Sequence, residues 1–132
     1  MVLGTEIGRA SALRMCYATY SKGSAALVCA VLGTAQSLGV LDALEAEWSR
    51  RGSSFAEEAK QRARRVTRRA WRFEGEMHEI ASTFSQVGLP QGFQSAAAEV
   101  FGRLAPLKSS PSLLSLVSVL MAIQAPADED GN

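Results

Sequence analysis

The sequence predicts an all-α domain with one long helix at the N-terminus and about five shorter helices after it. Ala, Leu, Ser, Glu and Arg dominate the composition, and the unbranched side chains among them lose little rotamer freedom in a helix. The segment from Glu6 to about Leu38 contains no proline, and its apolar residues recur near multiples of 3.6. With 132 residues, 47% of them hydrophobic, the chain is sized for one small globular domain.

The first helix is expected to span Glu6 to about Leu38, a length of about 45–50 Å at 1.5 Å per residue. Its second half is apolar on nearly every side, so it should pack against several partners. Gly39 is the expected stop signal. Small residues in this half would let neighbouring backbones approach closely: Gly23, Ser24, Ala25, Ala26, Ala30 and Gly33.

Two short helices are expected next. The first runs from Leu41 to Arg50, with its apolar residues on one face, and Gly52 ends it. Ser54 followed by Glu57 predicts a capping box at the start of the third helix, because hydroxyl and carboxylate would satisfy free backbone donors reciprocally.

Three further helices complete the predicted fold. The fourth is expected from about Thr67 to Val87, and Gly88 closes it. Pro90 is placed in the first turn of the fifth, where proline is tolerated, and that helix carries an amphipathic stripe. The stripe consists of Phe93, Ala97, Val100, Phe101 and Leu104. Residues 106–111 are expected to be a linker, and Ser112 to Gln124 a strongly apolar sixth helix.

This pattern divides the chain into three parts. Residues 1–105 are expected to form the helical domain. Residues 106–124 are expected to supply the linker and a sixth helix that packs on the same domain or on a dimer partner. The acidic residues 125–132 are expected to form a disordered tail.

Location and redox state follow from the start of the chain and its cysteines. The N-terminus lacks a basic stretch followed by an apolar segment, so we expect no secretory signal and a cytoplasmic location. Two uncharged runs, 23–41 and 109–127, are too interrupted by polar residues or proline to cross a bilayer. Cys16 and Cys29 would lie roughly 20 Å apart on one helix, beyond disulfide reach, and are expected to be small core residues.

Charge is nearly balanced overall but uneven along the chain. Fourteen Lys and Arg face thirteen Asp and Glu, a net charge of +1, so total charge does not indicate a polyanionic partner. The segment from Arg50 to Arg72 is nevertheless strongly basic. It contains Arg50, Arg51, Lys60, Arg62, Arg64, Arg65, Arg68, Arg69 and Arg72. Three interpretations stay open: a solvated face complementing acidic neighbouring helices, a site for anions or a cofactor phosphate, and a nucleic-acid surface. The last is the weakest, because interleaved aromatic residues are confined to Trp71 and Phe73.

A polar row is expected on one face of the first helix. Ser11, Arg14, Ala18 and Lys22 follow one another at spacings of three, four and four. Such a row with a small residue in it can line a pocket for an anionic substrate, although an exposed row fits the spacing equally well.

No motif for a metal or a nucleotide is present. The sequence lacks a glycine-rich dinucleotide fingerprint, a phosphate-binding loop and paired Cys or His ligand spacing. The single histidine, His78, lies beside Glu76 and Glu79, which do not share a face with it and cannot complete a zinc site. We expect no metal and a solvated or interface histidine.

Two blocks of residues resemble a known family, the helical C-terminal domain of 6-phosphogluconate dehydrogenase-like and β-hydroxyacid dehydrogenase-like NAD(P)-dependent oxidoreductases. The resemblance is narrower to a subfamily whose C-terminal domain was catalogued as of unknown function. The first block is GRASALRMCYA at residues 8–18, continued by Ser21, Lys22 and Gly23. The second comprises AWRFEGEM at 70–77, EIA at 79–81, GLP at 88–90 and AEVF at 98–101. Together they cover roughly residues 4–104.

This resemblance implies half of a two-domain enzyme. In the family an N-terminal Rossmann domain binds the nicotinamide cofactor, the long first helix of the C-terminal domain lines the active-site cleft, and the helical domains pair. The resemblance therefore implies a homodimer, a small anionic substrate, and a Rossmann domain that is either the other part of a longer protein or a separately encoded partner. It also implies that this chain alone binds no NAD(P) and is not active alone.

One departure from the family pattern affects the expected chemistry. Arg14 and Tyr17 occupy the positions of the family's proton-transferring lysine and of an asparagine that follows it. Arginine stays protonated, so it can anchor an anion but is a poor general acid or base. The resemblance makes Arg14 and Lys22 the candidate catalytic residues, and Ser11, Tyr17 and Ala18 the candidate substrate-binding residues. The alternative is a non-catalytic helical dimer that binds a ligand or assembles proteins.

Overall fold

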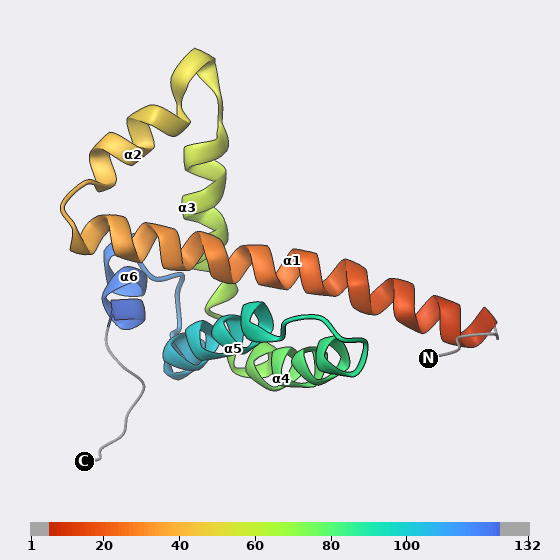
Figure 1. The fold of residues 1–132 in the computed structure, drawn as a ribbon. Helices are drawn as coiled ribbons and strands as arrows, with labels where there is room; N and C mark the ends of the chain where they lie inside the picture. The colour runs from red at the N-terminus through yellow and green to blue at the C-terminus, as the bar shows by residue number, and fades with distance from the viewer. Residues whose placement is uncertain (1–5, 125–132) are drawn as a thin grey trace.

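The computed structural model describes residues 6–124, and in that range the chain is helical without a β-strand. Helix α1 (Glu6–Ser37) has 32 residues and runs the length of the molecule (Figure 1). The all-α fold, the long first helix and the number of shorter α-helices in this range are as predicted from the sequence.

The other helices begin and end near their predicted positions. They are α2 (Leu41–Trp48), α3 (Phe55–Val66), α4 (Ala70–Gln86), α5 (Gly92–Leu104) and α6 (Leu116–Gln124), with short 3-10 helices η1 (Arg50–Gly52) and η2 (Ala105–Ser109). The three expected stop glycines, Gly39, Gly52 and Gly88, have φ angles of 74°, 76° and 83°. Glycine adopts this left-handed conformation without steric cost, and Gly39 and Gly88 follow the ends of α1 and α4 as predicted. Helix α2 ends at Trp48 with Ser49 as its C-cap, so Gly52 ends the 3-10 helix η1 rather than α2.

The capping box predicted at the start of α3 is absent. Ser54 makes no side-chain cap bond, and its hydroxyl instead donates to Glu58 Oε2 at 2.8 Å. Its backbone (φ −91°, ψ 8°) is not extended as in most N-cap residues, so the hydroxyl does not face the first free amides. The amide of Phe55 donates to the Ser53 hydroxyl at 3.1 Å.

Three further boundaries differ from the prediction. Pro90 lies before α5 rather than in its first turn, because the amide of Leu89 still donates to the Phe84 carbonyl at the end of α4. The expected linker 106–111 is partly the 3-10 helix η2. Helix α6 begins at Leu116 rather than at Ser112. At its start the backbone amide of Ser118, which lies in the first turn, donates to the Ser115 hydroxyl at 3.2 Å. The predicted acidic tail lies outside the described residues.

The core forms around the second half of α1. This half packs against α3, α5 and α6, and α4 packs against α5 (Figure 1). Phe101 of α5 is fully buried and meets Phe73 of α4 edge to face, with ring centroids 5.5 Å apart. Close approach uses the small residues as expected: a Cβ at Gly33 would lie 3.1 Å from Ile123 Cγ2 of α6.

The two cysteines differ from each other. Cys29 is fully buried, and burial raises its pKa to about 12, so its thiol stays protonated as a structural residue. Cys16 is exposed, which corrects the expectation that both are core residues. It lies on the side of α1 that faces away from the core, whereas its neighbour Met15 packs against the core.

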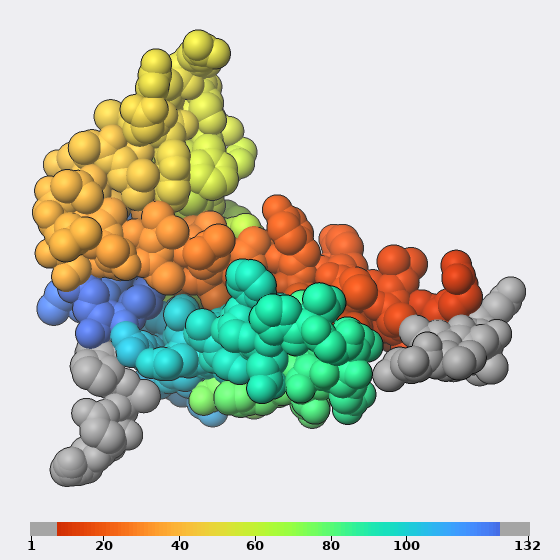
Figure 2. Space-filling model, viewed as in Figure 1, coloured from red at the N-terminus to blue at the C-terminus, as the bar shows by residue number. Residues whose placement is uncertain are grey.

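Helix α1 carries an uncovered apolar stripe. The stripe consists of Leu13, Tyr17, Tyr20, Leu27 and Leu38, each between 63% and 78% exposed. Successive members of the stripe are three, four, seven or eleven positions apart in the sequence. Successive helical residues turn by about 100°, which places this stripe opposite the buried Ala25 and Cys29. The space-filling view shows the N-terminal half of α1 running out with its upper side bare (Figure 2). Among residues 6–124, no helix combines the length and the apolar character needed to span a membrane.

Candidate functional site

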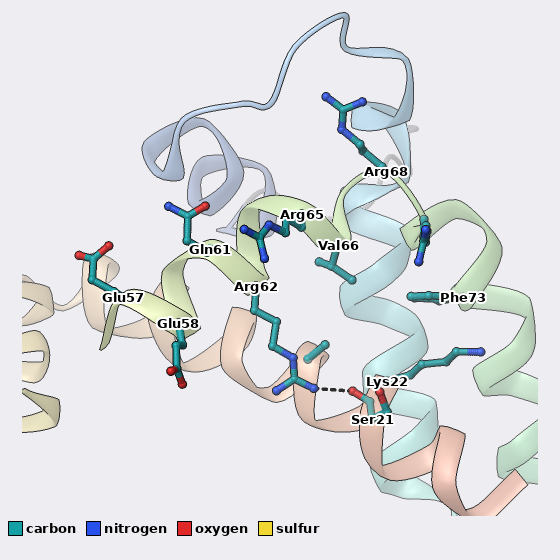
Figure 3. Close-up of a pocket in the computed structure, with 12 residues that line it drawn as sticks. Ser21, Lys22, Glu57, Glu58, Gln61, Arg62, Arg65, Val66, Arg68 and Phe73 are labelled. Carbon is teal, nitrogen blue, oxygen red and sulfur yellow. Dashed lines mark hydrogen bonds between the residues drawn. The ribbon is translucent and has the colours of Figure 1, made fainter. Parts of the chain in front are cut away.

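A groove of about 860 Å³ lies between α1, α3 and the beginning of α4 (Figure 3). This volume is within the range of small-molecule sites. The residues that line it are Ser21, Lys22, Ala25, Glu57, Glu58, Gln61, Arg62, Arg65, Val66, Arg68, Arg69 and Phe73. The groove thus carries five cationic side chains and two carboxylates.

The sequence of α3 explains why arginines reach this groove. Its alanines and Val66 are buried at helical spacing, so one face is held against the core and the arginines between them are directed outward. Arg62 and Arg65 come from this helix, and Arg68 and Arg69 from the turn that leads into α4. Arg69 is also the N-cap of α4, whose first turn contains no acidic residue.

Arg62 fixes α3 to α1. Its Nη2 donates to the Ser21 carbonyl and to the Ser24 hydroxyl, both at 2.6 Å. The dashed line in Figure 3 marks the first of these bonds. Because guanidinium offers five donors, the remaining N–H groups of Arg62 stay free for another acceptor.

Lys22 is held at the other side of the groove. Its ammonium forms an ion pair with Glu76 of α4 and lies 4.7 Å from the centre of the Phe73 ring. The cation is therefore fixed by a carboxylate and by the face of an aromatic ring. Helix α4 supplies both partners.

The remaining arginines of the groove have no acidic partner. Within residues 6–124, Arg65, Arg68 and Arg69 make no hydrogen bond or ion pair through their side chains. Figure 3 shows Arg68 projecting away from Lys22, at the rim. Arginines without partners retain their full hydrogen-bonding capacity for an anion.

The two carboxylates of the groove are already engaged. Glu57 forms an ion pair with Lys60 at 3.0 Å, and Glu58 accepts a hydrogen bond from the Ser54 hydroxyl. Hydrogen bonds to Glu57 and then to Glu45 raise the pKa of Lys60. Both glutamates lie at the end of the groove away from Lys22 and Phe73 (Figure 3), so the positive charge is concentrated at the opposite end.

The basic segment is therefore divided in two. Lys60 pairs with Glu45 and Glu57, and Arg50 with Glu47 at 2.8 Å, as expected of a solvated face beside acidic helices. The arginines of the groove do not follow this pattern. Acidic partners thus support the solvated-face interpretation for Arg50 and Lys60, and the anion-site interpretation stays a prediction for the groove.

The predicted polar row of α1 does not gather in one pocket. Lys22 lines the groove, whereas Ser11 and Arg14 are exposed near the N-terminal end of α1. Ala18 is half-buried between Arg14 and Lys22. Tyr17, the fifth predicted site residue, is 76% exposed and belongs to the apolar stripe. Ala18 and Lys22 lie on the same side of α1 as its buried residues, opposite the stripe.

Sequence patterns alone did not join Lys22 to the arginines. Ser21 and Arg62 are 41 positions apart, so the contact between them depends on the packing of α3 across α1. His78 is exposed as expected, and the described part of the chain holds no cluster of His, Cys, Asp or Glu that could bind a metal.

The fold and the groove define an all-α domain with a basic ligand-sized site. Residues 35–104 match the family described as a domain of unknown function (DUF1932), just over half of the chain. The protein belongs to this family. No curated protein and no solved structure matches it. The family match contains α2 to α5 and most of the groove, whereas Ser11, Arg14 and Lys22 precede it.

Proposed function

We propose that the chain is the helical, substrate-side and dimerisation domain of an NAD(P)-dependent oxidoreductase, working with a Rossmann domain that is not part of it. Membership of the DUF1932 family and the resemblance of both sequence blocks to dehydrogenase C-terminal domains support this proposal. The substrate is a small anion.

The projecting half of α1 is the observation that carries the proposal. Its two sides differ: the polar row with Arg14 and Lys22 continues the buried side of the helix, and the apolar stripe lies opposite. Large exposed apolar surface marks an interaction site. In the proposed enzyme the polar row lines a cleft whose other wall is the Rossmann domain, and the apolar stripe meets a second copy.

The cofactor belongs to the partner domain. Residues 6–124 contain no βαβ unit and no helix N-terminus preceded by a glycine-rich turn, so they do not fit a dinucleotide site. Arg14 would bind a carboxylate or phosphate and stabilise negative charge. Lys22 is the residue able to transfer a proton, and Glu76 fixes its position.

The alternative is a helical dimer that has lost catalysis and binds a ligand or a protein. Arg14 in place of lysine and the unpaired arginines of the groove favour it. The Arg14→Lys variant in a reconstituted two-domain protein separates the two functions. A change in hydride-transfer activity supports the oxidoreductase. Unchanged activity means that Arg14 has no part in hydride transfer and does not favour either function.

Calorimetry with NADH tests the division of labour between the domains. We expect no measurable binding to the isolated chain up to a concentration of about 1 mM, because the nucleotide site lies on the other domain. Binding in the micromolar range by this chain alone would contradict the proposal. NADH is chosen because its two phosphates form an internal pyrophosphate bridge, so that it carries no terminal phosphate.

A further inference from the structure

We propose that the groove between α1, α3 and the beginning of α4 binds the terminal phosphate of a small phosphorylated molecule, with Arg65 and Arg69 as its main contacts. The inference goes beyond the proposed function, because it concerns a site formed by this chain alone. It holds whether or not a Rossmann domain joins the chain.

The donors of the groove are suited to a dianion. Arg65 and Arg69 have no side-chain partner within residues 6–124, and Arg62 is fixed to α1 with donors to spare. Guanidinium groups bind phosphate oxygens in pairs and remain charged at every physiological pH. A terminal phosphate monoester offers three oxygens and nearly two charges, which several arginines can share.

The beginning of α4 adds to this field. Arg69 is its N-cap, makes no side-chain cap bond, and is followed by a first turn without acidic residues. The positive end of a 17-residue helix thus lies beside the arginines. The two carboxylates that line the groove, Glu57 and Glu58, lie at its far end (Figure 3) and have partners of their own. Glu76, at the near end, is paired with Lys22.

The organic part of the ligand has an apolar place to lie. Ala25 and Val66 are buried beneath the groove, and Phe73 presents its ring there. A pocket with a few convergent polar groups and an apolar lining is typical of small-molecule sites.

The short distance over which the groove arginines are spread favours a small ligand over a nucleic acid. Arg62 and Arg65 are three positions apart on α3, roughly 5 Å along the helix, and Arg69 follows in the turn before α4, an extent suited to one or two phosphates. Duplex binding usually requires a longer series of phosphate contacts. The carboxylates at one end of the groove would also repel a polyanion that continued through it.

Nuclear magnetic resonance titration of the wild-type chain with glycerol 3-phosphate, at constant ionic strength, tests the proposal. We expect saturable shifts at the amides of α3 and at the start of α4. The variant Arg65→Gln/Arg69→Gln should bind at least about tenfold more weakly, since two charge-assisted contacts are lost. Arg65→Lys/Arg69→Lys should fall between them, because it keeps the charge and loses the paired donors.

The matched control is Arg9→Gln/Arg51→Gln, which removes the same charge at exposed positions outside the groove. Its affinity should stay within about twofold of wild type; an equal loss in both double variants would overturn the site, as would absent or non-saturable shifts. Circular dichroism verifies that each variant is folded.

Comparing glycerol 3-phosphate with a second titrant, adenosine 2′-monophosphate, identifies the source of the phosphate. Adenosine 2′-monophosphate carries the terminal phosphate of a phosphorylated nicotinamide cofactor, and glycerol 3-phosphate that of a small substrate. Tighter binding of either one supports the site and assigns its source. Preference for a short DNA duplex, with a steep dependence on salt, would overturn the small-ligand proposal.

Discussion

Replacing Phe101 by alanine should lower the free energy of unfolding by about 3–5 kcal/mol. The side chain is fully buried where α5 meets α1 and α4, and its ring packs edge to face on Phe73. Removing it leaves a cavity and takes the edge-to-face contact away from Phe73. Since a small domain is stable by only about 5–15 kcal/mol, much of the stability would be lost. Urea unfolding followed by circular dichroism measures the effect.

Phe93→Ala on the same helix is the matched control. Phe93 is 75% exposed, so its loss should change the free energy of unfolding by no more than about 0.5 kcal/mol. Equal effects of the two substitutions would mean that α5 does not turn its Phe101 side toward the core.

Introducing two carboxylates into the apolar stripe should dissociate the proposed homodimer. Tyr20 and Leu27 are seven positions apart on α1 and are 78% and 63% exposed in the single chain. Burying two unpaired charges between copies would be strongly unfavourable. The dissociation constant of Tyr20→Glu/Leu27→Glu should rise at least about 100-fold, while the single chain stays folded because both positions face away from its core.

Sedimentation equilibrium at micromolar concentration measures this change. Ser82→Glu adds a carboxylate at an exposed position of α4, away from the stripe, and should leave the dimer intact. A monomeric wild-type chain would contradict the prediction, and so would a double variant as dimeric as the control.

Much of the fold is determined by local signals that are visible in the sequence. The proline-free start gave α1 its length, and Gly39 and Gly88 follow the ends of their helices because glycine adopts a positive φ without cost. The prediction was wrong where a side chain had a choice of partners. Ser54 bonds to Glu58 instead of capping α3, and no spacing rule decides between the two.

The candidate site was predictable only in part. Lys22 and the basic segment from Arg50 to Arg72 are both visible in the sequence, but no sequence pattern connects them. Packing brings them together, since Arg62 reaches α1 through the Ser21 carbonyl and the Ser24 hydroxyl. Which residues of α1 are buried also depends on how the other helices pack against it. Cys29 is covered by other helices and Cys16 is not, although both were assigned to the core.

The central claim is that the chain completes an oxidoreductase by docking on a Rossmann domain. A competition experiment tests it most directly, using the separately produced Rossmann domain of a full-length DUF1932 relative and its own fluorescently labelled helical half. We predict that this chain displaces the labelled half, and that Arg14→Glu weakens the displacement by reversing a charge of the polar row. If the labelled half binds and an excess of this chain leaves it bound, the account is contradicted.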